Sequence, residues 1–235
     1  MAHLTFHGHS CFELETDTGA IILFDPFLDD NPIADIGTDD IARADFILCS
    51  HGHYDHFPDG LKIAKRTGAT MIGAFELMSF AELQGVKSVH RMNVGGGFAF
   101  PFGYAKMTPA MHSGTVEGDT EGAFTSCANG FWIDLEPRQG QEGRKRLYHA
   151  GDTALLMEMQ LLRGRVDVAL LPIGDNFTMG PEDAARAVEF IAPRIVIPMH
   201  YDTWPPIAQD AQAFARRVGA LAEVVVLEPG ESYDF

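Results

Sequence analysis

Apolar and polar residues along the chain mark out a series of short strands, with helices between and after them. Short apolar or alternating runs, bounded by Gly, Pro and charged residues, predict β-strands. These runs cover residues 4–7, 11–15, 20–25, 46–49, 70–73, 88–92, 98–100, 105–111, 130–135, 146–150, 168–172, 194–198 and 223–227. Helices are expected at residues 58–66, 75–84, 154–162, 181–191 and 207–218. The run at 46–49, Phe-Ile-Leu-Cys, is apolar throughout, which is typical of a strand buried on both faces.

The order of these elements indicates a layered fold. Strand-rich segments come first and helices follow in each half of the chain, which predicts two sheets packed face to face with helices outside. We therefore expect an α/β fold, a four-layer αββα sandwich built from two similar halves. No linker divides the halves, so residues 1–235 are expected to form a single domain. A chain of this length buries enough surface for a full hydrophobic core.

The balance of charges excludes one large class of partner. The chain has 33 Asp and Glu residues against 17 Lys and Arg, a formal net charge of −16, and apolar residues make up 46% of it. Binding to nucleic acid depends on basic side chains that neutralise phosphates, so we expect no nucleic-acid partner. The basic cluster Arg144-Lys145-Arg146 follows the polar run 138–143 and is typical of a solvated hairpin turn.

The lack of targeting signals and the use of cysteine favour a cytoplasmic location. The first ten residues have neither a basic nor an apolar signal-peptide region, and apolar runs stay far below the roughly 18 residues that span a bilayer. We therefore expect no membrane association. Cys11, Cys49 and Cys127 are an odd number and form no C-x-x-C pair, which suits a reducing compartment. Each is expected to pack as a small core residue.

The strongest chemical signal is the segment His51-Gly52-His53-Tyr54-Asp55-His56, directly after the predicted buried strand at 46–49. Alternate side chains of an extended segment point the same way, so His51 and His53 can share one metal ion while Asp55 and His56 face a second. A single histidine is usually a hydrogen-bonded core residue. Three imidazoles and a carboxylate crowded together instead require a cation to compensate them, so the segment predicts a metal site.

This segment resembles the signature of the metallo-β-lactamase superfamily, H-x-H-x-D-H after a buried strand. Later landmarks match in order: His112 in Met111-His112-Ser113, Asp152 in Ala150-Gly151-Asp152-Thr153, and His200 in Pro198-Met199-His200-Tyr201. More narrowly, Gly8-His9-Ser10, Asn176-Phe177-Thr178-Met179 and His200-Tyr201-Asp202-Thr203 resemble the uncharacterised hydrolases related to L-ascorbate-6-phosphate lactonase. The resemblance extends from Phe6 to Gly230.

The resemblance implies a dinuclear site at the edge of the sheets. His51, His53 and His112 would hold the first ion, Asp55, His56 and His200 the second, and Asp152 would bridge both. Imidazole and carboxylate ligands suit two divalent ions per chain, with Zn²⁺ expected and Mn²⁺ or Fe²⁺ as alternatives. Two such ions supply a metal-bridged hydroxide at neutral pH. The expected function is hydrolysis of a small ester, lactone or phosphoester, with Asp55, His56 and Asp152 as the catalytic residues.

Other residues are candidates for support or substrate contact. Asp25 resembles a superfamily aspartate that orients a ligand imidazole, and His9 is expected at the floor of the site. Asn176, Thr178 and Thr203 are expected to contact substrate or order water, and Phe177, Met179 and Trp204 are candidates for the pocket wall. The remaining histidines, which we assign to structural roles, are His3, His7, His90 and His149.

Two other functions stay open at this point. The superfamily includes tRNA-processing endonucleases, so a nucleotide- or RNA-directed phosphodiesterase is the rival enzyme, although no long inserted arm for RNA is present. A metal-binding module without catalysis is the alternative from another class; the complete set of ligands speaks against it. A small molecule is the expected partner, and the sequence leaves open the substrate, the native metal and whether the chain forms a homo-oligomer.

Overall fold

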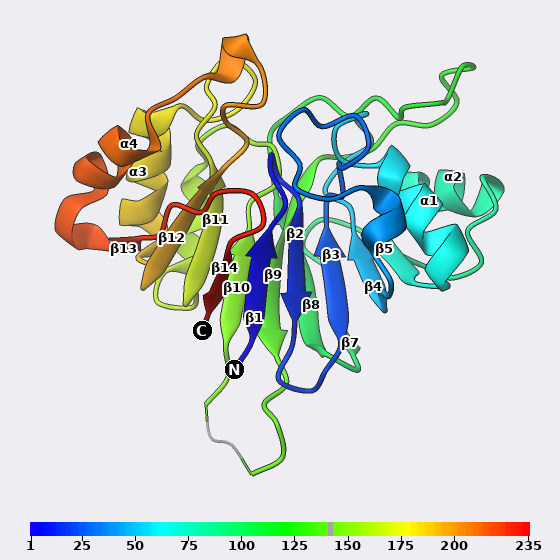
Figure 1. The fold of residues 1–235 in the computed structure, drawn as a ribbon, viewed down its shortest axis with the longest axis horizontal. Coiled ribbons are helices and arrows are strands. Elements are labelled where there is room, and N and C mark those ends of the chain that lie inside the picture. Colours follow the sequence, from blue (N-terminus) through cyan, green and yellow to red (C-terminus); the bar gives the residue numbers. More distant parts are fainter. Residues whose placement is uncertain (141–142) are drawn as a thin grey trace.

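Two seven-stranded sheets lie face to face at the centre of the molecule (Figure 1). The computed structural model describes residues 1–140 and 143–235. The first sheet has the order β14-β1-β2-β3-β4-β5-β6, with β1 His3–Phe6, β2 Phe12–Glu15, β3 Ile21–Phe24, β4 Phe46–Leu48, β5 Thr70–Ala74, β6 Val89–Met92 and β14 Ser232–Asp234. The second has the order β13-β12-β11-β10-β9-β8-β7, with β7 Gly97–Phe100, β8 Gly103–Pro109, β9 Asn129–Leu135, β10 Arg146–His149, β11 Val168–Pro172, β12 Ile195–Met199 and β13 Glu223–Val224.

The helices flank the sheets on their outer sides. Helices α1 (Pro58–Thr67) and α2 (Phe75–Leu83) lie at one flank and α3 (Pro181–Ile191) and α4 (Ala211–Val218) at the other (Figure 1). Short 3₁₀ turns complete the set: η1 Thr38–Asp40, η2 Met157–Leu162, η3 Pro205–Ile207 and η4 Gly219–Leu221. The predicted four-layer αββα sandwich is confirmed. Of the described helices, none combines the length and apolar character that a membrane span requires.

Both sheets follow the same plan, which confirms the expectation of two similar halves. In the first, β1, β2 and β3 pair antiparallel and β3 to β6 pair parallel. In the second, β7 to β10 pair antiparallel and β10 to β13 pair parallel. Buried apolar side chains of both sheets form one core. The fully buried strands β11 and β12 are those covered on both faces, as continuous apolar runs predict.

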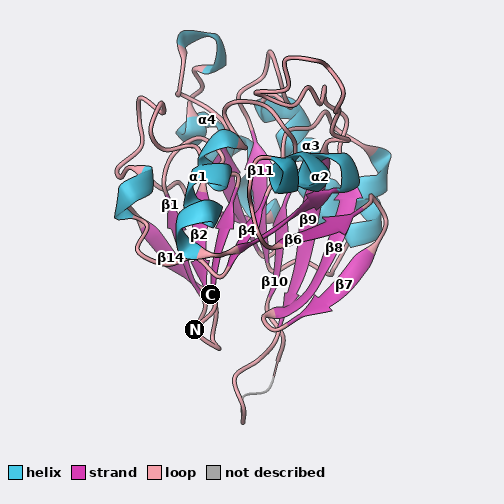
Figure 2. Cartoon of the chain, turned by 90° about the vertical axis from the view of Figure 1, so that its right-hand side faces the viewer, coloured by secondary structure: helices cyan, strands magenta, loops and turns pink. Residues whose placement is uncertain are grey.

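This pairing brings the carboxyl ends of distant strands to one end of each sheet. Strand β1 runs antiparallel to β2 and β2 antiparallel to β3, so β1 points the same way as β3 and β4. In the second sheet β8 points the same way as β10 and β12 for the same reason. Figure 2 shows the long loops gathered at one end of the sheets, away from the two termini. Residues that follow these strands can therefore meet.

Several predicted elements differ from the structure. The helix expected at 154–162 is only the 3₁₀ turn η2, because Leu156, directly before it, is extended with φ −123° and ψ 141° and ends any helix that would include residues 154–155. The helix expected at 207–218 begins at Ala211, where the Asp210 side chain accepts from the Ala213 N–H and sets the helix start. The strand expected at 223–227 ends at Val224.

Two further differences concern the C-terminal strand and one cysteine. Strand β14 was not predicted; it forms because β1 offers it an antiparallel edge, with Leu4 opposite Tyr233. Cys127 is exposed rather than packed in the core, whereas Cys11 and Cys49 are buried as expected. The predicted hairpin around residues 138–143 joins the antiparallel strands β9 and β10, but residues 141–142 lie outside the described part of the chain.

Candidate metal centre

Side chains from six strand ends meet at the end of the sheets described above. They are His9 after β1, Asp25 after β3, residues 51–56 after β4, His112 after β8, Asp152 after β10 and His200 after β12. Strand ends are rigid supports, since the core holds the strand while the next residues reach outward. The structure thus places every predicted ligand in one region, although the sequence separates the first and last of these residues by nearly the full chain.

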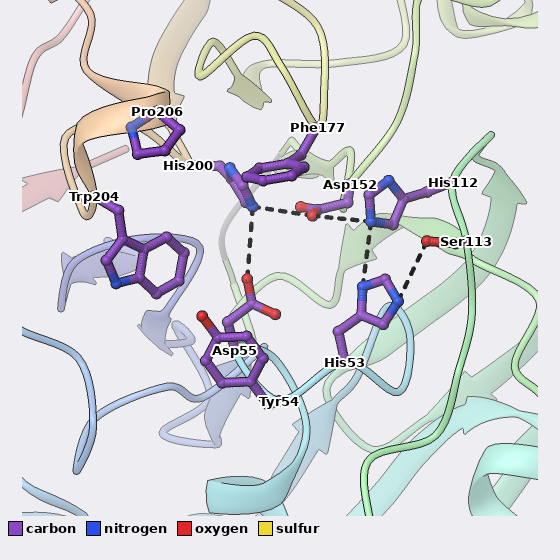
Figure 3. Close-up of a pocket in the computed structure, with 10 residues that line it drawn as sticks. All are labelled: His53, Tyr54, Asp55, His112, Ser113, Asp152, Phe177, His200, Trp204 and Pro206. Carbon is purple, nitrogen blue, oxygen red and sulfur yellow. Dashed lines mark hydrogen bonds and ion pairs between the residues drawn. The ribbon is translucent and has the colours of Figure 1, made fainter.

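Asp152 lies at the centre of this cluster. Its Oδ2 is 3.0 Å from His200 Nε2, 3.4 Å from His56 Nε2 and 3.5 Å from His112 Nε2. His51 Nε2 is 4.0 Å from the same oxygen. Figure 3 shows the Asp152 carboxylate between His200 on one side and His112 on the other. One carboxylate oxygen therefore faces imidazoles of both predicted ligand groups, which is the arrangement expected of a bridging ligand.

The potential metal-binding atoms fall into two main groups, which a third group of His51, His56 and Asp152 connects. Within each, one ligand atom per residue lies within 4.8 Å of the others: His51, His53 and His112 in one, and His9, Asp55, His56 and His200 in the other. In the first group His51 Nε2 lies 2.8 Å and His112 Nε2 3.3 Å from His53 Nδ1. The second group contains the three residues predicted for the second ion, with His9 in addition.

The buried polar atoms of the cluster test whether these residues fit metal ions. Within the described residues, His56 Nε2, His200 Nε2 and Asp152 Oδ1 have no hydrogen-bond partner although they are buried. An unpaired buried polar atom is costly unless something satisfies it. Nitrogen and carboxylate ligands without thiolate suit Zn²⁺, Mn²⁺ or Fe²⁺. The residues present therefore fit divalent ions of this kind.

The electrostatics of the cluster favour the protonation states that metal binding needs. Burial, reinforced by neighbouring imidazoles, lowers the pKa of His51, His53 and His112, so these rings stay neutral with a lone pair available. Burial alone would raise the pKa of Asp152 and Asp55, but the imidazoles around them outweigh it and hold both below the ordinary range. Neutral imidazoles and ionised carboxylates are the metal-binding forms.

The carboxylates around His56 favour a positive charge on its ring. Burial opposes its protonation, but the carboxylates of Asp152, Asp55 and Asp25 outweigh burial and raise the pKa of His56 well above its usual value. Three carboxylates around one fully buried ring create a local demand for a cation. A proton on His56 or a divalent ion on its Nε2 would each satisfy that demand.

Asp25 contacts the Nδ1 side of the His56 ring, in the position expected of a carboxylate that orients a ligand imidazole. Its Oδ2 lies 3.0 Å from His56 Nδ1 and accepts from the Ser50 hydroxyl at 2.6 Å, while its Oδ1 accepts from the Ser50 N–H at 2.6 Å. The carboxylate can only accept, so Nδ1 of His56 carries the proton and donates it to Asp25. When the ring is otherwise neutral, as metal binding requires, His56 Nε2 has its lone pair directed toward Asp152.

His9 is fully buried beneath Asp55 and His200. Its Nε2 lies 3.1 Å from Asp55 Oδ2 and its Nδ1 lies 2.8 Å from the Thr203 hydroxyl oxygen. Because the carboxylate accepts, Nε2–H donates to Asp55 and Thr203 donates to Nδ1. Burial, with the neighbouring His200, lowers the pKa of His9 to about 3, so the ring is neutral. The His9 carbonyl also accepts the His200 N–H at 2.7 Å, which joins the loop after β1 to the end of β12.

The backbone is strained where it supports the cluster. His9, Asp25 and His200 have φ values of 58°, 41° and 55°. These lie in the left-handed region, which residues other than glycine rarely adopt. Such conformations cost of order 1 kcal/mol or more each and concentrate at functional sites. Gly52 serves a different need: a Cβ there would lie 2.9 Å from the Thr115 carbonyl oxygen, so glycine lets the loop after β8 cross the His51–His53 segment.

A cavity of about 510 Å³ opens beside the cluster. Five predicted ligands line it: His53, Asp55, His112, Asp152 and His200. The rest of its lining is Tyr54, Ser113, Phe177, Trp204 and Pro206 (Figure 3). The cavity therefore presents the metal-binding atoms together with mostly aromatic or apolar surface.

The residues predicted to contact substrate have different placements. Asn176 is exposed, and the Thr178 hydroxyl donates to the Met179 carbonyl. Neither is among the described residues that line the cavity; Phe177, between them, is. Thr203 is buried and reaches the cluster only through His9. Contact of Asn176 and Thr178 with substrate stays a prediction.

Some residues of the site were not singled out by the sequence. Tyr54 lines the cavity from the centre of the His51–His56 segment, and Ser50 connects that segment to Asp25. Ser113 and Pro206 line the cavity next to His112 and Trp204. For Ser50, Tyr54 and Ser113 the position beside a predicted ligand was the only available signal, and for Pro206 there was none, because nothing in a single sequence shows which residues near a ligand turn toward the cavity.

The histidines assigned to structural roles lie in contacts of that kind. His3 and His7 pair with Asp234 and Asp35, and His90 packs against phenylalanines. His149 is fully buried, with Nε2 3.1 Å from the Ser10 carbonyl oxygen and Nδ1 accepting the Gly151 N–H at 3.1 Å. Both ring nitrogens of His149 are therefore engaged beside the cluster rather than in it.

Comparison with known proteins agrees with this architecture. A family model described as "Beta-lactamase superfamily domain" matches residues 3–200. A UPF0173 metal-dependent hydrolase of Heliobacterium modesticaldum is 46% identical, and the alignment covers 99% of this chain and 97% of that protein. A UPF0173 metal-dependent hydrolase of Methanopyrus kandleri is also 46% identical, and the alignment covers 98% of this chain and 99% of that protein.

Solved structures show the same fold. A metallo hydrolase from the archaeon Ignicoccus hospitalis matches with a TM-score of 0.86 and 35% identity, over 100% of this chain and 99% of that one. An isothiocyanate hydrolase from Delia radicum gut bacteria matches with a TM-score of 0.76 but 18% identity, over 99% and 98%, which shows the fold alone. Two mixed sheets with flanking helices, a buried cluster of His and Asp and near-complete alignment with these relatives place the chain among the UPF0173 metal-dependent hydrolases of the metallo-β-lactamase superfamily.

Proposed function

We propose that this chain holds two divalent ions, Zn²⁺ by expectation, and hydrolyses a small ester, lactone or phosphoester. His51, His53 and His112 would hold the first ion and Asp55, His56 and His200 the second, with Asp152 shared. One observation carries the proposal: Asp152 Oδ2 lies within 4.0 Å of imidazole nitrogens from both groups. A carboxylate in that position offsets charge on two cations at once.

The ions and the chain would divide the chemistry between them. When bound, a pair of divalent ions lowers the pKa of a coordinated water toward neutrality and polarises the scissile group. Asp55 lines the cavity, and its carboxylate is held ionised by His56 and His9. An ionised carboxylate there can accept a hydrogen bond from the attacking water and orient it. His9 fixes the angle of that carboxylate, and Asp25 fixes the ring of His56.

A small substrate suits the size and charge of the site. A cavity of about 510 Å³ is within the ordinary range for small-molecule sites. The net charge of −16 opposes a polyanion, so it supports a small molecule over RNA. The resemblance to hydrolases related to L-ascorbate-6-phosphate lactonase supports an ester or lactone as the reacting group. The buried unpaired ligand atoms and the open cavity beside them support catalysis over a purely structural metal.

The test combines metal analysis with a hydrolysis screen. The purified protein should contain about two equivalents of metal per chain after loading with Zn²⁺ or Mn²⁺. Hydrolysis of lactones or aryl esters should disappear with a chelator and return with added metal. A single ion in fully loaded, fully active protein would contradict the dinuclear site. Activity on bis-p-nitrophenyl phosphate alone would favour the phosphodiesterase, and no metal-dependent hydrolysis of any substrate class would favour a non-catalytic module.

A further inference from the structure

Beside the metal-binding atoms, the wall of the cavity is aromatic. Tyr54, Phe177 and Trp204 form it, and Tyr54 and Phe177 are 50% and 54% exposed. The Tyr54 and Trp204 rings lie 5.9 Å apart between centroids, and both pack on the buried ring of Phe27 at 5.8 Å and 5.9 Å. Figure 3 shows Trp204 and Phe177 on either side of His200, with Tyr54 across from Phe177. Large aromatic faces left open to water favour contact with an apolar group.

The loops around the cavity carry no basic residue. Lys and Arg are absent from six segments that supply its lining and the ligands: 25–37, 50–57, 110–128, 150–156, 173–180 and 200–210. Every one of these segments contains Asp or Glu. Sites that recognise phosphate or carboxylate groups use Lys or Arg to receive them. The sequence of these loops provides none.

Lys62 does not fill this role. It lies in the neighbouring hollow that Tyr54 separates from the cavity, and its Nζ is 2.8 Å from Asp59 Oδ1 and 3.0 Å from Asp29 Oδ2. The same hollow is also lined by Asp30 and Glu117. The charge of Lys62 is therefore balanced by two carboxylates, and this side of Tyr54 is acidic as a whole.

A second anionic group on a substrate would be poorly placed in such a site. Two divalent ions beside Asp55 and Asp152 leave a net positive charge, so an anion with no other partner would be drawn to the ions in place of the reacting group. Enzymes avoid this by holding the second anion with a basic side chain, and the described cavity has none. A positively charged group would be repelled by the same ions. An uncharged group gains by covering the aromatic wall.

We propose, building on the proposed hydrolase function, that the site takes substrates in which an uncharged apolar or aromatic group flanks the scissile bond, and that Tyr54, Phe177 and Trp204 select that group. For an ester, water adds across the acyl carbon–oxygen bond and yields the carboxylic acid and the alcohol. The similarity to the lactonase of a phosphorylated substrate then extends to the ester or lactone chemistry and not to recognition of a phosphate.

The substrate test varies only the charge far from the reacting group. p-Nitrophenyl benzoates bearing a para methyl, carboxylate or trimethylammonium group share one leaving group, and the rigid ring keeps the added charge away from the acyl carbon. Values of kcat/KM for the Zn²⁺-loaded enzyme are divided by the hydroxide-catalysed rate of each ester. We expect the methyl compound to exceed both charged compounds by about tenfold or more, the scale of one unfavourable charge at a partly hydrated site. Preference for either charged ester overturns the proposal.

A matched pair of variants locates the selectivity. Phe177→Lys adds a cation to the aromatic wall and should raise the carboxylate-to-methyl ratio of kcat/KM by about tenfold. Phe98→Lys makes the same change at an aromatic residue of β7 that is 48% exposed and outside the cavity lining, so it should leave the ratio unchanged. Equal shifts in both variants would show that net charge, rather than the wall, controls selectivity and would overturn the proposal.

A binding measurement separates this inference from the proposed reaction. Acetohydroxamate, benzohydroxamate and 4-carboxybenzohydroxamate present the same metal-binding group with different remote parts. Calorimetry on the Zn²⁺-loaded protein should show benzohydroxamate binding about tenfold tighter than the other two. That result supports the selective wall even if no ester is turned over, in which case only the proposed reaction fails. Equal affinities, or tighter binding of the carboxylated compound, overturn the inference while leaving metal-dependent hydrolysis intact.

Discussion

Replacing Asp25 with Asn would change one buried carboxylate and little else. Asn is nearly the same size, and Asn and Asp are the residues that best tolerate a left-handed backbone such as the φ of 41° at this position. Asp25 Oδ1 accepts from the Ser50 N–H, while Oδ2 accepts from the Ser50 hydroxyl and from His56 Nδ1. The substitution Asp25→Asn therefore perturbs hydrogen bonding at His56 without a change of shape.

The expected effect follows from the donors and acceptors. If the amide oxygen stays on the Ser50 N–H, the amide NH₂ faces His56 Nδ1 and makes that nitrogen an acceptor. The ring proton then moves to Nε2, the atom that points toward Asp152 and would bind the second ion. If the amide turns over, its NH₂ meets the Ser50 N–H, and two donors face each other. Loss of such an orienting carboxylate costs 10- to 100-fold in metal affinity, or about 1.4–2.7 kcal/mol.

Zinc titration of the variant by equilibrium dialysis measures this directly. Asp25→Asn should weaken one of the two zinc equivalents by 10- to 100-fold and leave the other close to wild type. Nitrogen NMR of the His56 ring should show the proton on Nε2 instead of Nδ1. Asp59→Asn is the matched control, because it makes the same change at a buried carboxylate whose partners are the Leu28 N–H, the Asp29 N–H and Lys62 rather than a predicted ligand. Wild-type affinity for both ions in Asp25→Asn, or an equal loss in Asp59→Asn, would refute the reasoning.

Four further predictions concern the ligands, the core and the partners. Asp152→Asn removes charge shared by two ions, so metal content should fall by about one equivalent and kcat by at least about 10²-fold at a nearly unchanged melting temperature; wild-type turnover with one ion would contradict the bridge. His200→Ala should lose mainly the second ion, measured as metal content falling from about two equivalents to about one. Burial lowers the pKa of His149, so the neutral ring stabilises the fold above the unfolded pKa of about 6.5, and that stability is lost as pH falls below it. Urea unfolding between pH 5 and 7 should show a smaller decrease in His149→Gln than in wild type; identical slopes would count against this. Finally, tRNA should not bind at physiological salt, and a salt-sensitive, sub-micromolar complex in a gel-shift assay would contradict the charge argument.

The sequence alone determined the order and type of most elements. Alternating and continuous apolar runs identify the strands because they record which faces are buried, and this holds for β4, β11 and β12 with no tertiary information. The segment from His51 to His56 predicted a metal site because four metal-binding side chains so close together have no stable alternative without a cation. The local sequence was therefore sufficient to predict these strands and this metal site, because burial of a strand and crowding of ligands within six residues are both properties of one short segment.

Only the tertiary structure decided how distant segments meet. The contact of His9 with Thr203 joins residues 194 positions apart, and β14 exists because β1 presents a free edge to it. The expected helix at 154–162 is shortened to η2, and the Ala154 N–H before it donates to the Met111 carbonyl, a contact between distant segments that propensity does not record. The turning of Phe177 toward the cavity, rather than Asn176 or Thr178, was likewise set by the fold. Burial patterns constrain each strand by itself, whereas register, loop crossings and side-chain direction depend on partners far away in the chain.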